Sequence, residues 1–323
     1  MIEAFLGPLQ RWLMQAGTLF VVGISAWRWI VWPRSVTALP RASRGVEVRS
    51  RADEILSTVA GMGCLAAILL IADWLLGFAV QILGFRDPFV PLGEDAAFLL
   101  QRTFWGSVWI GQGLLVVGLA LTLWRLARPY GGGRDVVPKS RATATSRTAG
   151  WGTAAALSLG LPVTMALSSH AMSVSGAGRV VAVGADAFHT VAAGSWIGAL
   201  SVILLLAIRS KDEPGFLAAQ LMAFSPMALV AVPLLVLMGG TLAVSHVPSI
   251  QDLWQTPYGQ VLAAKILFVA MVLLLGFTNW RRGLPALDSA VGIRTVRYRA
   301  GLEVGLAGVV LGLTAALTGM PGP

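Results

Sequence analysis

The chain has 323 residues, of which 56% are hydrophobic and 12% charged, and its mean hydropathy is +0.75. Soluble domains contain about 25% charged residues, so this composition excludes a water-soluble enzyme. The net charge of +9 suggests nucleic-acid binding, but the basic residues lie in short groups between long apolar runs. That pattern is typical of a polytopic membrane protein. We therefore expect an all-α, multi-pass membrane protein whose surroundings are the lipid bilayer, with no nucleic-acid partner.

Eight apolar runs predict eight transmembrane helices, since about 20 apolar residues of helix cross a bilayer. The first run is too long, and lacks the basic flank, to be a cleavable signal peptide. We expect the fourth helix to be short, and the second and fifth to tilt or to extend beyond the bilayer. The runs lie near residues 12–32, 55–85, 103–124, 150–168, 180–208, 222–245, 259–280 and 300–319.

The distribution of basic residues predicts the orientation of these helices. Five arginines lie between residues 34 and 51, and similar basic groups follow the third, fifth and seventh runs. The alternate linkers contain few basic residues. Cytoplasmic linkers carry the excess of Lys and Arg, so both termini should be periplasmic in a bacterial inner-membrane protein.

Residues 130–149, rich first in Gly and then in Ser, Thr and Arg, predict a flexible cytoplasmic linker. It would separate three N-terminal helices, in residues 1–129, from five C-terminal helices, in residues 150–323. In the last helix, small residues recur on one stripe between 301 and 319, which predicts a face for close helix packing.

Three ionisable residues inside the apolar runs are the first candidates for function, because such groups cost free energy in a bilayer. Asp73 lies in the second run, where it is either a relay or a buried neutral carboxyl group. Asp186 and His189 are three residues apart on one face of the fifth. They either hold a metal, with Asp186 accepting the ring N–H of His189, or hydrogen-bond neighbouring helices. Three residues nearer the run ends should snorkel to water, namely Arg28, Lys265 and Glu303.

Soft metal ligands gather on the predicted outer side. His170 ends the fourth run and His246 ends the sixth. Imidazole and thioether groups suit Cu(I), so we predict an outer-face copper capture site, with acidic loop residues Glu94, Asp95 and Asp252 nearby. Solvated histidines and core-filling methionines are the alternative. The methionines on this side are Met165, Met172 and Met238.

Several strings between about residues 165 and 282 resemble the copper resistance protein D (CopD) family of bacterial inner-membrane proteins. One string has the form D-x-x-H-x-x-x-x-x-x-W-x-G and runs from Asp186 to Gly198. A second has the form T-x-Y-G-x-x-x-x-x-K and runs from Thr256 to Lys265. Shorter matches are Ser169-His170-Ala171, Gly239-Gly240-Thr241 and Asn279-Trp280-Arg281.

The resemblance implies copper handling across the cytoplasmic membrane rather than enzymatic catalysis. It implies uptake of Cu(I) from the periplasm, beside a periplasmic copper-binding partner of the CopC type. The positions that match the family pattern are Asp186, His189, Trp196, Tyr258, Lys265 and Asn279. Below His189, soft ligands thin out to Met227, Met271 and Cys64, which would be the next steps of a copper path.

Two other functions stay open from the sequence. His189 and a second histidine could be the axial ligands of a b-type haem in a membrane redox protein, and a Soret band would then be visible. The chain could also dock a periplasmic copper carrier without transporting copper, which predicts a copper-dependent complex and no flux.

Overall fold

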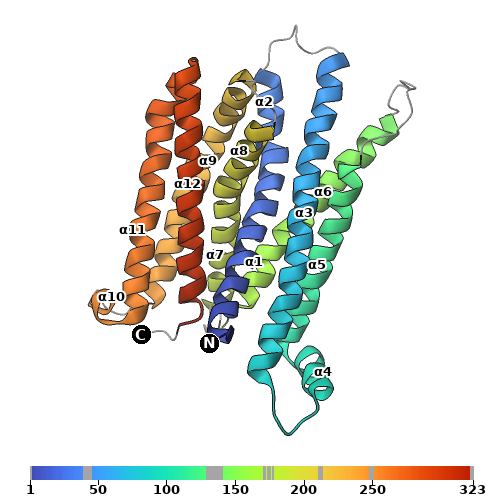
Figure 1. Cartoon of the computed structure of the whole chain (residues 1–323), viewed down its shortest axis with the longest axis vertical. Coiled ribbons are helices and arrows are strands. Elements are labelled where there is room, and N and C mark those ends of the chain that lie inside the picture. Colours follow the sequence, from blue (N-terminus) through green and yellow to red (C-terminus); the bar gives the residue numbers. More distant parts are fainter. Residues whose placement is uncertain are drawn as a thin grey trace.

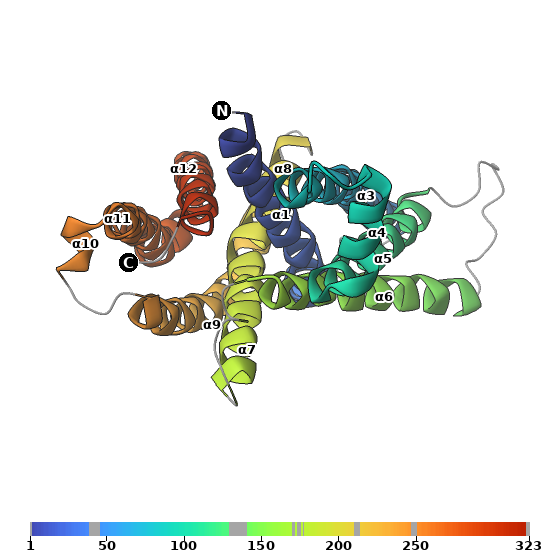
Figure 2. The ribbon, with the colours of Figure 1, turned by 90° about the horizontal axis from the view of Figure 1, so that it is seen from below.

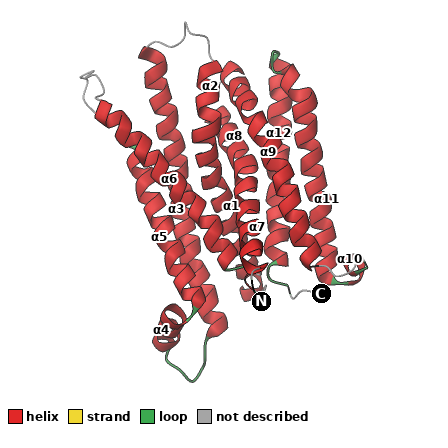
Figure 3. Ribbon diagram, turned by 180° about the vertical axis from the view of Figure 1, so that it is seen from behind, coloured by secondary structure: helices red, strands yellow, loops and turns green. Residues whose placement is uncertain are grey.

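A computed structural model describes residues 2–38, 46–128, 141–169, 172, 176, 178–209, 214–246 and 251–320. These parts are helical, with short connecting loops (Figure 3). Besides α-helices they contain the π-helical turns η1, η4 and η5 and the 3-10 turn η6. In chain order the elements are α1 (Ile2–Ala26), η1 (Trp27–Val31), α2 (Trp32–Ala38), α3 (Val46–Phe85), α4 (Leu92–Arg102), α5 (Phe104–Ala127), α6 (Arg141–Leu167), α7 (Gly178–Ala193), η4 (Gly194–Gly198), α8 (Ala199–Arg209), α9 (Pro214–His246), α10 (Asp252–Gln255), α11 (Pro257–Thr278), η5 (Asn279–Gly283), η6 (Leu284–Ala286) and α12 (Ala290–Leu317).

The predicted spans are confirmed: in the described residues, eight helical segments are long and apolar enough to cross a membrane. Each coincides with one predicted run. The second and fifth extend over 35 and 32 residues, longer than the about 20 that a bilayer requires. This architecture is that of a multi-pass membrane protein.

Among the described spans the fourth, Thr145–Leu167 with 23 residues, is the shortest, as expected. Its helix α6 nevertheless begins earlier, at Arg141, within the residues predicted as a linker. Ala and Arg are good helix formers, so the helix continues where hydropathy falls. The amphipathic helix α4 was not predicted, because its 11 residues are too few to form an apolar run.

The start of α1, the end of α12, and the short helices α4 and α10 lie at one end of the bundle (Figure 1). The ends of α2, α5 and α8 lie at the opposite end (Figure 1). Successive spans therefore run in opposite directions, so the linkers lie at alternate ends of the bundle as the basic residues predicted. Which end faces the periplasm stays a prediction.

Reporter fusions test this orientation. A reporter placed after Gly132 or after Asp288, both in basic linker regions, is expected to report the cytoplasm. A matched fusion after Phe89, in the loop between α3 and α4, should report the periplasm. A periplasmic signal at Gly132 or Asp288 would reverse the orientation.

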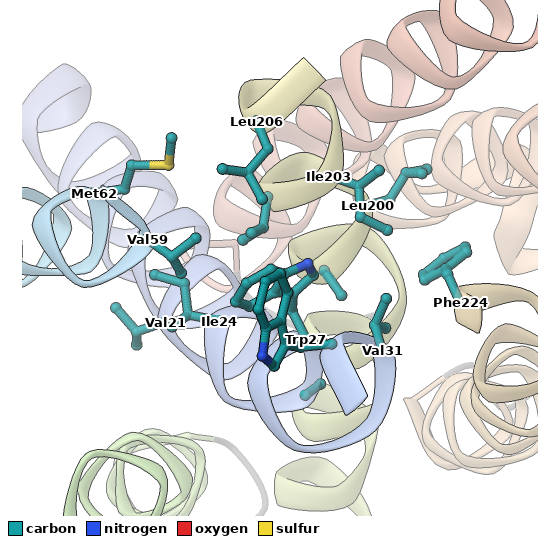
Figure 4. Packing of buried hydrophobic residues seen from close by; sticks show 14 of the residues in the cluster. Val21, Ile24, Trp27, Val31, Val59, Met62, Leu200, Ile203, Leu206 and Phe224 are labelled. Carbon is teal, nitrogen blue, oxygen red and sulfur yellow. The ribbon is translucent and has the colours of Figure 1, made fainter. Parts of the chain in front are cut away.

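Helix α1 is central to the bundle. It packs against α3 and α6 on one side and against η4, α8 and α12 on the other (Figure 2). Figure 4 shows Ile24 of α1 and Trp27 of η1 beside Leu200 and Ile203 of α8, and all four are almost fully buried. The spans before and after residues 130–149 are therefore joined through α1.

The small-residue stripe of α12 packs along only part of its length. The Cβ positions of Gly301, Gly305 and Gly308 face open space, whereas that of Gly312 lies against Trp12 of α1. The Trp12 indole also donates a 3.0 Å hydrogen bond to the Gly308 carbonyl. The predicted packing face is thus confirmed for its second half and wrong for its first half, because α1 covers only the second.

Candidate functional site

His189 of α7 lies in the bundle and is held by the backbone of α9. Its Nδ1 atom is 3.2 Å from the Leu235 carbonyl oxygen. A carbonyl only accepts, so Nδ1 carries the hydrogen of the neutral ring, and the lone pair is on Nε2. A backbone carbonyl that fixes the tautomer in this way is common behind metal-binding histidines. The prediction that Asp186 accepts this N–H was wrong, because α9 is in contact with the ring and supplies the acceptor.

Gly239 allows the imidazole ring to approach α9 this closely. A Cβ atom at position 239 would lie 2.9 Å from Cε1 of His189 and 3.3 Å from Nδ1. Any larger residue there would move the ring away from the Leu235 carbonyl. This gives a physical reason for the glycine of the Gly239-Gly240-Thr241 string.

Two opposite charges accompany His189. Asp186 lies one turn earlier on α7, and Lys265 comes from α11. His189 interacts electrostatically with both, and Lys265 interacts with Asp186. The Lys265 side chain is partly buried, and its charge interacts with the Asp186–His189 pair. Its snorkelling to water stays a prediction.

The structure places the predicted methionines at different depths of the bundle. Met238 is partly buried and lies on the turn of α9 that contains Leu235 and Gly239, the two residues that contact His189. Met165 of α6 packs against the apolar core, which is the core-filling alternative. The side chain of Met172 is partly buried, and its N–H donates to the Ser169 carbonyl at 3.1 Å.

The two other histidines stay predictions. His170 and the side chain of His246, the last residue of α9, lie outside the described residues. The outer-face capture site and the haem alternative, which both need them, are therefore not tested. In the part of the chain that is described, no group of three or more His, Cys, Asp or Glu side chains could hold a metal ion. A metal bound at His189 would need thioether or other donors.

The acidic residues predicted beside the capture site do not lie together. Helix α4, with Glu94 and Asp95, and helix α10, with Asp252, lie on opposite sides of the bundle (Figures 1 and 2). Asp95 is also buried, and its Oδ2 accepts a 3.2 Å hydrogen bond from the Asp87 N–H. It holds the loop before α4 and does not form part of a shared acidic surface.

Asp73 of α3 forms a separate polar pair with α1. It is 4% exposed, and its Oδ2 accepts a 3.0 Å hydrogen bond from Nε2 of Gln10. Its Oδ1 is buried without a hydrogen-bond partner among the described atoms. The relay role of Asp73 stays a prediction.

The soft residues suggested as further steps of a copper path differ in their surroundings. Met271 is 43% exposed on the outside of the bundle, and Met227 packs in the apolar core. The Cys64 thiol donates to the Ala120 carbonyl at 3.8 Å, between α3 and α5. These three positions lie on three different helices, α11, α9 and α3, and the path from His189 through them stays a prediction.

A second polar group, which the sequence analysis missed, joins α12, η5 and η4. Glu303 is 3% exposed and accepts a 3.2 Å hydrogen bond from the amide nitrogen of Asn279. It also accepts a hydrogen bond from Trp196. The prediction that Glu303 snorkels was wrong, because α12 begins at Ala290, capped by Ser289, and not near 300.

Sequence signals for these residues were present but partial. Lys265, Asn279 and Trp196 lie in the strings that resemble the CopD family, whereas Glu303 is part of an apolar run without any motif. The Leu235 carbonyl is a backbone group, and no residue pattern predicts its role.

Comparisons with known proteins point to the same family, and the family-model match contains the string from Thr256 to Lys265 but not the one from Asp186 to Gly198. Residues 218–317 match the family model of copper resistance protein D. The copper transport protein CutJ of Bacillus subtilis (strain 168) is 29% identical over 227 residues, which are 69% of this chain and 38% of CutJ. Copper resistance protein D of Pseudomonas syringae pv. tomato is 26% identical over 290 residues, which are 85% of this chain and 86% of that protein.

The matches differ in how much of each relative they cover. The chain spans well under half the length of CutJ but most of the Pseudomonas protein. No solved structure matches. The family model covers Lys265, Asn279 and Glu303, and the longer pairwise match covers more of the bundle. The resemblance that the motifs indicated is thus confirmed: this chain is related to the copper resistance protein D family, and its residues 218–317 carry the match to that family.

Proposed function

We propose that this chain transports copper across the bacterial cytoplasmic membrane, taking Cu(I) from the periplasm toward the cytoplasm with His189 as a ligand. One observation carries the proposal. His189 presents the lone pair of Nε2 inside a membrane-spanning bundle while the Leu235 carbonyl holds the other ring nitrogen. The names of the two relatives, one a copper transport protein and one a copper resistance protein, point to the same metal.

The chemistry of the donors favours Cu(I). Imidazole nitrogen and thioether sulfur are ligands that Cu(I) accepts, whereas a hard cation would require several oxygen ligands. His189 and Met238 offer one of each from the facing helices α7 and α9. His170, His246, Met165 and Met172 would take copper first at the periplasmic end, from a CopC-like carrier.

The charges beside His189 give the site a way to release copper. With no copper bound, the Lys265 ammonium balances the Asp186 carboxylate. A Cu(I) ion that binds here compensates the Asp186 charge in place of Lys265. The Lys265 ammonium and the copper ion then repel each other. Competition between the two cations keeps affinity moderate, which transport requires, because an ion that binds too tightly does not leave.

Copper uptake into proteoliposomes tests the proposal. Purified full-length protein should accelerate Cu(I) accumulation above empty liposomes, and metal analysis should find bound copper. Absence of flux, together with copper-dependent binding of a periplasmic carrier, would assign the chain to docking instead. A Soret band in the purified protein would favour the haem alternative.

The proposed repulsion by Lys265 predicts that removing its charge raises the affinity for Cu(I). Lys265→Leu is expected to strengthen Cu(I) binding by tenfold or more, because it removes a positive charge without adding a metal ligand, and like charges several ångströms apart repel by a few kcal/mol at an effective dielectric constant near 20. Competition titration with a Cu(I) chelator measures the change. Lys265→Arg keeps the charge and should leave the affinity near that of the parent. Weaker binding in Lys265→Leu would show that Lys265 supports the site instead of opposing the metal.

A further inference from the structure

Glu303 is a buried acid that copper coordination at His189 does not use. It lies in α12, thirteen residues after the helix begins at Ala290, and is 3% exposed. An ionisable side chain at this depth of a membrane is expensive and is a functional candidate by default. Three helical segments, α12, η5 and η4, contribute side chains around its carboxyl group.

The surroundings of Glu303 contain hydrogen-bond donors but no cation. The Asn279 amide and the Trp196 indole donate to the carboxyl group. Gly276 of α11 lies beside Glu303 and Trp196, since a Cβ atom there would be 3.4 Å from Glu303 Oε1 and 3.3 Å from the Trp196 ring. None of the described charged groups of its own helix or of the elements packed on α12 interacts electrostatically with Glu303; these groups are Arg294, Arg297 and Arg299 of α12 itself, and Arg11, Arg209, Lys265, Arg281 and Arg282 of its neighbours.

Asn279 has one polar atom without a partner. Its Nδ2 donates to Glu303 Oε2 at 3.2 Å, but its Oδ1 is buried without a hydrogen bond from any described group. A buried acceptor of this kind needs a donor. A protonated carboxyl group has an O–H to donate, and an ionised one has none. A proton on Glu303 would offer Oδ1 a donor from the carboxyl group that already accepts from Nδ2 of the same amide.

The same three side chains suit the ionised state as well. Two N–H donors stabilise a carboxylate, since hydrogen bonds to a charged acceptor are stronger than those between neutral groups. The neutral state thus gains a hydrogen-bond donor, and the ionised state gains strength in the hydrogen bonds that it accepts. The site also has a fixed relation to the copper ligand, because Trp196 follows His189 by seven residues, about 10 Å along a helix.

We propose that Glu303, held by Asn279 and Trp196, is a proton-binding site that couples copper movement to protonation. This proposal rests on the proposed function for its coupling part. Glu303 exchanges one proton with water. In the neutral state its O–H donates to Oδ1 of Asn279, and in the ionised state it only accepts. The exchange changes the charge next to the copper path by one unit.

Infrared spectroscopy tests the proton site without reference to transport. In full-length protein in lipid nanodiscs, a carbonyl stretching band of a protonated carboxyl group should appear and disappear across a pH series. Glu303→Gln should remove that band. The glutamine amide can both donate to Oδ1 and accept from Nδ2 of Asn279, so it imitates the neutral state and should fold. Asp73→Asn, which alters another buried carboxyl group, and Glu54→Gln, at an exposed one, should keep the band.

Copper flux in proteoliposomes tests the coupling. Uptake by the parent should respond to an imposed pH gradient, and Glu303→Gln should lose that response while it binds Cu(I) as the parent does. Unchanged gradient dependence in Glu303→Gln would overturn the coupling, and an unchanged infrared band would overturn the proton site. A parent without copper flux would refute the proposed function, and the infrared result would still decide whether Glu303 binds a proton.

Discussion

Replacing His189 by alanine is expected to abolish copper uptake while leaving a folded, membrane-inserted protein. The change removes the Nε2 lone pair and one hydrogen bond, to the Leu235 carbonyl. Hydrogen bonds between membrane helices contribute about 0.6–2 kcal/mol, which is too little for their loss to unfold the bundle. Cu(I) competition titration measures the loss of binding, and proteoliposome uptake measures the loss of transport. Thermal unfolding in detergent checks the fold.

Matched variants separate ligation from packing. Phe188→Ala changes the neighbouring side chain, which is 62% exposed, and should leave both binding and uptake unchanged. Asp186→Asn should weaken binding without abolishing it, because Asp186 contributes charge and not a bond to the ring. Gly239→Ala should also weaken binding by displacing the ring. If His189→Ala moves copper as the parent does, the His189 site is a contact between helices and copper takes another path.

The spans could be predicted from the sequence because crossing a bilayer sets a length and a hydropathy that local residues satisfy alone. Their ends could not be predicted in the same way. Ser289 caps α12 and Thr256 caps α11 through hydrogen bonds to backbone N–H groups. These caps begin each helix before the apolar run does. For Glu303 the shift moves the carboxyl group from the predicted membrane edge into the bundle.

The contacts between helices were beyond prediction for a different reason. Asp186 and His189 share a helical face, which the spacing of three residues indicated. The Leu235 carbonyl reaches His189 from 46 residues away and Asn279 reaches Glu303 from 24 residues away. Such pairs depend on which helices pack together. The π-helical turns η4 and η5, which contain Trp196 and Asn279, likewise follow from packing, and turns of this kind are frequent at functional sites.

Gly198→Ala is expected to cause a large loss of stability, because it forces apart two helices of the bundle. Gly194 and Gly198 form a small-xxx-small pair in η4, of the kind that lets membrane helices approach closely. A Cβ atom at Gly198 would overlap the Leu19 carbonyl oxygen of α1. Because that atom is backbone, no side-chain rotation relieves the overlap, and the helices must separate. Overpacking of this kind costs about 1–3 kcal/mol or more, measured as a lower thermal unfolding temperature in detergent.

The reciprocal substitution and a control locate the effect at this crossing. Gly23→Ala should be as destabilising, since a Cβ atom at Gly23 would overlap the backbone of Gly198. Gly184→Ala, in the same span but with nothing within 4 Å of its Cβ position, should leave the unfolding temperature unchanged or raise it. Equal stability of Gly198→Ala and Gly184→Ala would contradict the close crossing. Since η4 also carries Trp196, separation at this point should move the indole away from Glu303, so Gly198→Ala should change the Glu303 infrared band as well as the stability.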